Sequence, residues 1–195
     1  MKKVAITGGI GSGKSTVLSI LRNKGFVVFS CDEVYKEVIT SNQYIEKISK
    51  YFPKAVINGV IDRAILSETI FQSAEQQELL NSIAHPLIIE RLFQKIEKSN
   101  ADLVFVEVPL LFEANLESKF DNVIVVMRED EERINAVCVR DTTTKENVLK
   151  RIKSQFDYHS VDGRKRIEAC NARILVNEDS IEYLQNKINS ILNTI

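Results

Sequence analysis

Glycine, lysine and serine near the N-terminus follow a pattern that binds phosphate. Residues 8–15 read Gly-Gly-Ile-Gly-Ser-Gly-Lys-Ser and match G-x-x-x-x-G-K-[ST] in full. In this pattern the glycines let backbone N–H groups turn toward phosphate oxygens, the lysine supplies a positive charge, and the serine hydroxyl can bind Mg²⁺. The pattern predicts a protein that binds ATP or GTP. We expect the nucleotide to be contacted by Gly11, Ser12, Gly13, Lys14, Ser15 and Thr16.

Two carboxylates stand where strands are expected to end. Asp32 follows a short apolar segment and begins a helical stretch. It either caps that helix or lies at the carboxyl edge of a sheet, where it can take a proton from an acceptor hydroxyl, and spacing leaves both open. Glu107 ends another apolar segment. Its carboxylate either binds Mg²⁺ through water, near the Ser15 hydroxyl, or pairs with Lys14.

Alternating strands and helices must hold these residues in place. Apolar segments typical of buried strands occupy residues 3–7, 26–29, 103–108, 122–127 and 173–176. Helical spacing of apolar residues covers residues 14–24, 130–140 and 180–192. The order of strand, glycine turn, helix and strand at the N-terminus is that of a βαβ unit. It predicts an α/β fold with a parallel sheet covered by helices.

A long helical stretch separates the second strand from the third. Residues 32–98 show helical spacing, and Pro86 suits the first position of a helix. Such a stretch is longer than an ordinary crossover between strands, so we expect a helical region inserted beside the sheet. His85 precedes the proline, which favours an extended conformation. We interpret His85 as a helix cap or a contact to the substrate.

Composition and charge exclude several classes of protein. The 195 residues contain 26 Lys and Arg against 27 Asp and Glu, and the formal net charge of −1 argues against a nucleic-acid-binding protein. No apolar run is long enough to span a membrane. The three cysteines form no CxxC pair, so neither a zinc site nor a disulfide framework is expected. These features predict a soluble, cytoplasmic protein, and no obligate protein partner is evident.

A basic segment follows the fourth expected strand. From Arg133 to Arg173 the chain has ten Lys or Arg and five acidic residues. Such a run is either a solvated helical face or a cationic flap over an anionic ligand. Arg140 within it is either surface charge or a residue that stabilises a phosphoryl group during transfer. Because the motifs D-x-x-G, N-K-x-D and L-S-G-G-Q are absent, GTPases and transporter ATPases fit poorly, and a small P-loop kinase fits best.

Six short motifs in a fixed order resemble the dephospho-CoA kinase family over essentially the whole chain. They are residues 7–16 (T-G-G-I-G-S-G-K-S-T), Asp32, His85-Pro86, residues 109–113 (P-L-L-F-E), Arg140-Asp141 followed by Arg151-Ile152 and Gln155, and Asn177. The family commonly has Ala-Asp before the last strand, where this chain has Cys-Asn-Ala-Arg at residues 170–173. The departure touches neither the loop, nor Asp32, nor the lid arginines Arg140 and Arg151.

The resemblance implies one P-loop kinase domain over residues 1–195 that uses Mg²⁺ and ATP. Its parts are a core with a five-stranded parallel sheet (about 1–31, 99–132 and 170–195), a helical CoA-binding region (about 32–98) and a helical lid (about 133–169). The implied reaction transfers the γ-phosphate of ATP to the ribose 3′-hydroxyl of dephospho-CoA and yields coenzyme A and ADP. Another small-metabolite, nucleoside or nucleotide kinase, or a nucleotide-binding regulator without turnover, is the alternative.

The resemblance also implies roles for single residues. Asp32, Lys14 and Arg140 are expected to be catalytic, with Asp32 as the base that takes the hydroxyl proton. Asn177 is expected to contact ATP, whereas Glu113 receives no role. The residues expected to contact dephospho-CoA are Asp32, His85, Pro109 and Leu110.

Overall fold

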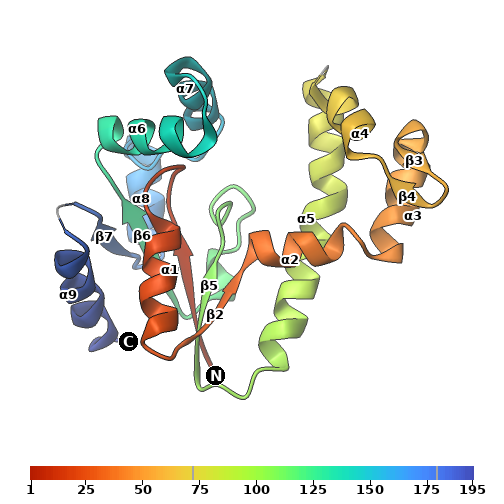
Figure 1. Cartoon of the computed structure of the whole chain (residues 1–195). Helices are drawn as coiled ribbons and strands as arrows, with labels where there is room; N and C mark the ends of the chain where they lie inside the picture. The colour runs from red at the N-terminus through yellow and green to blue at the C-terminus, as the bar shows by residue number, and fades with distance from the viewer. Residues whose placement is uncertain (72, 179) are drawn as a thin grey trace. The chain divides into compact units, whose positions relative to one another are not determined.

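The chain divides into two compact units. The computed structural model describes residues 1–71, 73–178 and 180–195 (Figure 1). The first unit contains Met1–Val28 and Ala101–Ile195, and the second contains Phe29–Asn100. The second unit nearly coincides with the helical region expected at residues 32–98. No helix in the described ranges combines the length and the apolarity needed to span a membrane.

A parallel sheet forms the centre of the first unit. In the part of the chain that the structure describes, its five strands lie in the order β2-β5-β1-β6-β7. Their bounds are β1 (Lys2–Thr7), β2 (Val27–Ser30), β5 (Leu103–Glu107), β6 (Asn122–Met127) and β7 (Arg173–Val176). Val4 of β1 lies opposite Phe105 of β5 and Asn122 of β6. The predicted α/β fold with a parallel sheet is confirmed, with strand ends that shift by about one residue.

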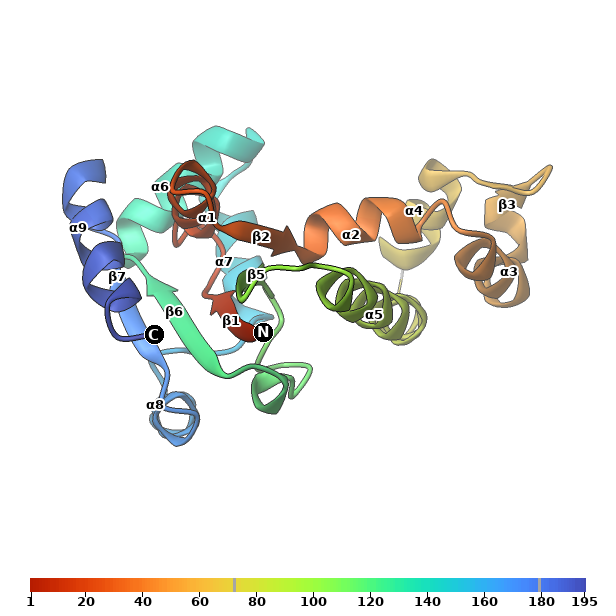
Figure 2. The same cartoon turned by 90° about the horizontal axis from the view of Figure 1, so that it is seen from below.

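Helices cover both faces of this sheet. The helices of this unit are α1 (Lys14–Asn23), α6 (Asp130–Asp141), α7 (Lys145–Lys153), α8 (Val161–Ala169) and α9 (Ile181–Leu192), with a short 3₁₀ turn η2 (Glu117–Lys119). Of these, α6 and α7 lie beyond the carboxyl ends of the strands (Figure 1). Helices α1 and α8 lie on opposite sides of β1 and β6 (Figure 2). Leu21 of α1 and Leu184 of α9 pack with Ile6 and Phe105 in one buried core. Because both faces are covered, the strands are apolar along their length rather than alternating.

A long helix forms the centre of the second unit. Helix α5 (Ala74–Glu97) packs against α2 (Cys31–Val38), α3 (Asn42–Tyr51) and α4 (Arg63–Phe71). Glu37 of α2 pairs with Lys95 and, at 3.5 Å, with Arg91 of α5. A 3₁₀ turn η1 (Pro53–Ala55) and two short strands, β3 (Val56–Ile57) and β4 (Val60–Ile61), lie between α3 and α4.

The expectation of helix alone over residues 32–98 is wrong at β3 and β4. These strands pair antiparallel around Asn58 and Gly59, whose φ angles are +51° and +77°. An Asn-Gly pair accepts the two left-handed conformations of a tight hairpin turn with little strain. The sequence Val-Ile-Asn-Gly-Val-Ile carried this signal, which the helical spacing on either side obscured.

The expected positions of Pro86 and His85 are also wrong. Pro86 lies inside α5, and His85 is a half-buried helical residue rather than an extended cap. Pro86 lacks the N–H that would bond to the carbonyl of Ser82, but both residues are exposed, so water can reach that carbonyl. Burial of Ile83, Ala84 and Leu87 holds the helix together across the proline.

The proline should therefore lower the stability of α5. We expect Pro86→Ala to raise the free energy of unfolding by about 1–3 kcal/mol, because alanine restores the N–H and has the highest helix propensity. Urea unfolding followed by circular dichroism measures the change. The matched neighbour Leu87→Ala should instead lose about 2–5 kcal/mol through the cavity it creates. A Pro86→Ala protein no more stable than wild type would contradict this account of the helix.

Candidate phosphate-binding site

The phosphate loop joins β1 to the first turn of α1. Gly13 has φ +97° and precedes Lys14, the first residue of α1. The carbonyl of Gly13 accepts hydrogen bonds from the N–H of Thr16 and of Val17, at 3.0 Å and 3.2 Å. Glycine has no side chain to cap the remaining N–H groups of the first turn. The helix therefore presents N–H donors and its positive end to an external anion.

Lys14 lies folded over the loop. Its Nζ donates to the carbonyl oxygens of Gly8 and Gly9, at 2.8 Å and 3.2 Å. Ser15, beside it, is exposed, and Thr16 is half-buried. Ser12 is buried and donates its backbone N–H to the carbonyl of Gly9. The predicted nucleotide-binding residues are thus brought together in one turn.

Asn177 supports the loop from the end of β7. Its backbone N–H donates to the carbonyl of Met127, and its side-chain Nδ2 donates to the carbonyl of Ser12 at 2.9 Å. A Cβ on Gly13 would lie only 2.0 Å from this Nδ2. The structure therefore places Asn177 against the loop backbone, where its amide helps to fix the shape of the loop.

Helix α6 packs against the other side of the loop. A Cβ on Gly11 would lie 2.4 Å from the backbone oxygen of Arg133. Ile10, at the tip of the loop, packs against a small apolar cluster that contains Ile134 and Val137 of α6 and Val148 of α7. The N–H of Ile10 donates to Oε1 of Gln155 at 2.9 Å. The basic segment is thus joined to the loop through backbone and apolar contacts.

Arg133 is the arginine of this helix that reaches the loop. Only 8% of it is exposed, and its Nε lies 2.8 Å from Oδ1 of Asp130. Its Nη1 would lie 2.4 Å from a Cβ on Gly9. This contact of Arg133, the first residue of the basic segment, was not predicted from the sequence. Helical spacing from the predicted Arg140 was the available signal, because residues seven apart share a helix face.

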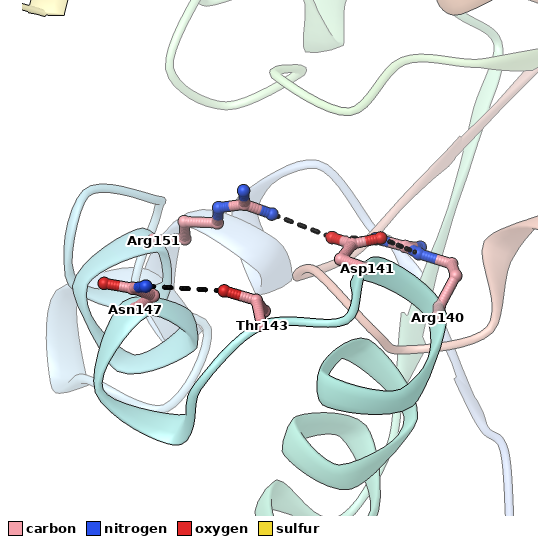
Figure 3. A network of polar contacts seen from close by, with 5 residues as sticks. All are labelled: Arg140, Asp141, Thr143, Asn147 and Arg151. Carbon is pink, nitrogen blue, oxygen red and sulfur yellow. Dashed lines mark hydrogen bonds and ion pairs between the residues drawn. The ribbon is translucent and has the colours of Figure 1, made fainter.

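Arg140 lies at the exposed end of α6. Its Nε and Nη2 donate to the two carboxylate oxygens of Asp141, at 2.7 Å and 3.1 Å. Arg151 of α7 donates to the same carboxylate at 2.8 Å (Figure 3). Hydrogen bonds from Arg140 and then Arg151 lower the pKa of Asp141. Seven residues of helix place Arg140 about 10 Å beyond Arg133 along the same face.

The end of β5 brings further predicted residues to this unit. Glu107 is buried and lies opposite Ile6, one residue before the end of β1. Pro109 and Leu110 are half-buried in the turn that follows. Glu113, which received no role from the sequence, accepts the N–H of Phe156 at 2.8 Å. Its carboxylate therefore anchors the chain that returns from α7.

Aromatic side chains strengthen this anchor. Phe112 is fully buried and stacks on Phe156 with ring centres 4.4 Å apart, and Tyr158 meets both rings edge-on. The hydroxyl of Tyr158 lies 3.2 Å from Oγ1 of Thr7, the residue that leads into the loop. Burial raises the pKa of Tyr158 to about 12, so this hydroxyl stays neutral. Arg166 lies over the Phe112 and Phe156 rings.

A cavity of about 670 Å³ opens beside Arg133. It lies between the start of α6 and the segment that follows α7. Its lining residues are Arg128, Glu129, Asp130, Arg133, Ile152, Lys153, Gln155, Phe156, Asp157, Tyr158 and His159. Gln155 and Arg133 border both this cavity and the phosphate loop, so the cavity continues from the place where phosphate is expected.

Asp32 and His85 belong to the second unit. Asp32 lies in the first turn of α2, where its N–H donates to the Ser30 hydroxyl oxygen at 3.2 Å. The capping alternative for Asp32 is therefore wrong, because Ser30 is the N-cap and Asp32 is an exposed residue of the first turn. Burial lowers the pKa of His85 in α5, which favours the neutral imidazole.

The chain is similar to dephospho-CoA kinases over nearly its whole length. A family model described as dephospho-CoA kinase matches residues 2–182. The dephospho-CoA kinase of Fusobacterium nucleatum is 34% identical over 194 residues, which are 98% of this chain and 97% of that protein. The corresponding enzyme of Thermus thermophilus is 33% identical over 97% of this chain and 89% of its own length.

Solved structures agree with these matches. A Thermus thermophilus protein superimposes with a TM-score of 0.81 and 31% identity, over 100% of this chain and 97% of its own. The dephospho-CoA kinase of Campylobacter jejuni superimposes with a TM-score of 0.67 and 26% identity, over 99% and 96% of the two chains.

Two glycines with the same φ provide a test of the contact between the loop and α6. Gly11 and Gly59 both have φ +77°, but a Cβ on Gly59 meets nothing within 4 Å. Both alanine variants should lose about 1–2 kcal/mol from left-handed backbone strain. Only Gly11→Ala should also push α6 from the loop, so we expect it to weaken ATP binding, measured by calorimetry, at least about tenfold. Equal ATP affinity in the two variants would show that the contact is unimportant.

Proposed function

The chain belongs to the dephospho-CoA kinase family, and we propose that the site around its phosphate loop performs the reaction of that family. The protein is a kinase that transfers the γ-phosphate of ATP to the ribose 3′-hydroxyl of dephospho-CoA, which forms coenzyme A and ADP in the final step of CoA synthesis. The observation that carries the assignment to this site is the complete phosphate loop at the start of α1, in a chain matched almost from end to end.

We assign ATP binding to the loop and the first turn of α1. The N–H groups from Gly11 to Thr16 surround the phosphates, and Asn177 holds the loop in the required shape. Lys14 moves from the carbonyls of Gly8 and Gly9 to the outer phosphates, which replace those oxygens as acceptors. The exchange keeps the lysine charge paired in both states.

Mg²⁺ is the metal that this proposal requires. In the described residues, no cluster of three His, Cys, Asp or Glu side chains could hold a metal by itself. Mg²⁺ usually takes one or two protein oxygens and completes its shell with phosphates and water. The exposed Ser15 hydroxyl and the Glu107 carboxylate at the end of β5 fit that need. Bound there, the ion would neutralise charge on the phosphates.

The proposed contacts to dephospho-CoA lie in segments that match the family motifs. Asp32 is the proposed base, because Ser30 performs the capping and leaves the Asp32 carboxylate available to take the hydroxyl proton. His85, Pro109 and Leu110 are the other proposed contacts to dephospho-CoA. A neutral imidazole at His85 suits hydrogen bonding to the substrate rather than pairing with its phosphate.

Residues 133–169 are proposed to form a lid over ATP. Arg140 would leave Asp141 and turn toward the transferred phosphoryl group, while Arg151 keeps the carboxylate paired. A lid excludes water, which would otherwise accept the phosphoryl group. We further propose a cytoplasmic location, in keeping with the free thiols of Cys31, Cys138 and Cys170.

An acceptor panel tests the proposed function. The wild-type protein is incubated with Mg²⁺ and ATP plus dephospho-CoA, adenosine, AMP or no acceptor, and ADP release is measured. We expect rapid ADP release only with dephospho-CoA and nearly none from Lys14→Ala, whose circular dichroism should match wild type. Transfer to adenosine or AMP instead would indicate another kinase, and ATP binding without any transfer would indicate a regulator.

Asp32→Asn tests the proposed base. The variant keeps the size of the side chain but removes the basic carboxylate, so kcat should fall about 10²–10⁴-fold. The melting temperature and the affinity for ATP should change little, because Ser30 still caps α2. Glu33→Gln removes a charge from the same helical turn and is the matched control. Asp32→Asn activity within a few-fold of the control would refute the assignment.

A further inference from the structure

We propose that Arg133 is a second catalytic arginine, whose guanidinium donates hydrogen bonds to the phosphoryl group during its transfer. The inference rests on the proposed function, since it assumes that ATP binds at the loop. It adds a residue that the sequence analysis did not name among the site residues. Arg140 lies on the same helix face, but its guanidinium is held by Asp141 about two turns farther along.

The position of Arg133 beside Gly9 carries the inference. Its Nη1 would lie 2.4 Å from a Cβ on Gly9. The guanidinium is therefore in van der Waals contact with the backbone of this glycine. The Nζ of Lys14 lies 3.2 Å from the carbonyl oxygen of the same residue. The loop lysine pairs with the outer phosphates in this motif. A cation that meets the same glycine therefore lies at the end of the loop where the γ-phosphate is expected.

Contacts with the loop fix the position of the Arg133 main chain. The carbonyl of Arg133 lies against Gly11, and its neighbour Ile134 packs with Ile10 from the tip of the loop. The Nε end of the guanidinium lies 2.8 Å from Asp130, one turn earlier. The helix, the loop and the ion pair thus orient the side chain before any ligand binds, which reduces the entropy lost on contact with phosphate.

Arg133 is suited to bind an anion because it is buried and has more N–H donors than the described part of the protein supplies acceptors. An arginine that is 8% exposed needs acceptors for five N–H groups. The pair with Asp130 is close but poorly aligned for a hydrogen bond, and that carboxylate is itself 59% exposed. Arg133 also lines the cavity of about 670 Å³, together with Arg128 and Lys153. An incoming phosphate would supply acceptors that Asp130 does not.

The proposed contact of Arg133 with the phosphoryl group forms and breaks no covalent bond of the protein. During transfer the bond from the γ-phosphorus to the bridging oxygen of ADP breaks, and a bond to the ribose 3′-oxygen forms. The proton of that hydroxyl passes to Asp32. Negative charge spreads over the three equatorial oxygens, and a planar guanidinium can donate to two of them. Arg133 would thus act on the transition state more than on bound ATP, and its loss should lower kcat.

Two substitutions and one control test the contact. Arg133→Gln removes the positive charge and the paired N–H donors of the guanidinium, and we expect kcat to fall about 10²–10³-fold. Arg133→Lys keeps a point charge, and we expect about a tenfold loss. Lys187→Gln removes an exposed cation of α9, outside the loop and the proposed lid, and should leave kcat unchanged. For each protein we would measure kcat, ADP affinity, the melting temperature and the affinity for ADP with aluminium fluoride and dephospho-CoA.

The last complex separates catalysis from support of the fold. Aluminium fluoride mimics the transferred group, so wild-type protein should bind ADP much more tightly in its presence. Arg133→Gln should lose most of that gain while ADP alone binds within about threefold of wild type. Equal losses in ADP affinity and melting temperature would overturn the proposal and show a structural role.

Activity thresholds complete the test. Arg133→Gln with kcat within about threefold of wild type would also overturn the proposal. If Arg133→Gln does not fold, the kcat of Arg133→Lys decides between the two outcomes. A wild-type kcat in Arg133→Lys would overturn the proposed contact of the guanidinium with two phosphoryl oxygens. Failure of the proposed function would show in the wild-type protein, whereas failure of this inference would show only in the variants.

Discussion

The loop depends on close backbone contacts at glycines. Three different segments approach it where a side chain would collide: a Cβ on Gly8 would lie 2.2 Å from the carbonyl oxygen of Val126 at the end of β6, on Gly11 it would meet α6, and on Gly13 it would meet Asn177. Each contact is too short for any residue with a Cβ. The sheet edge, the basic helix and the turn after β7 therefore converge on one loop. Its shape is fixed before a ligand arrives, as electrostatic stabilisation of a reacting group requires.

Other contacts of the first unit limit how the proposed lid can move. Its first helix, α6, is held at the loop by Ile10. The chain that follows α7 is held through Gln155, Glu113 and the Phe112–Phe156–Tyr158 cluster. Helix α6 and the chain that follows α7 are therefore both anchored to the rest of the first unit. The exposed polar network of Arg140, Asp141 and Arg151 lies between them, where α6 meets α7. Rearrangement on ligand binding is easiest there, since exposed ion pairs contribute little stability.

Features that depend on neighbouring residues could be predicted from the sequence, and those that depend on distant contacts could not. The strands and the phosphate loop follow from apolar segments and a complete motif. The hairpin at Asn58-Gly59 was missed although its signal was local, and Pro86 was misplaced because burial on the opposite face outweighs its cost to the helix. The contrast between Arg133 and Arg140 depends on packing against Gly9 and pairing with Asp141. Within the basic segment, Arg133 is buried at the loop and Arg140 is exposed to solvent.

The docking of α6 on Gly11 uses a main-chain oxygen, and this has an evolutionary consequence. Every amino acid carries that carbonyl, so replacement of the side chain at position 133 leaves the docking atom in place. Mutational drift at this position can therefore sample other side chains while this main-chain contact stays in place, and selection on the residue acts through its side chain alone. At Gly11 the reverse holds, because any added carbon removes the contact whatever its chemistry. Two positions in contact across one interface thus differ in evolvability, because geometry constrains Gly11 whereas the main-chain contact leaves the side chain at position 133 open to change.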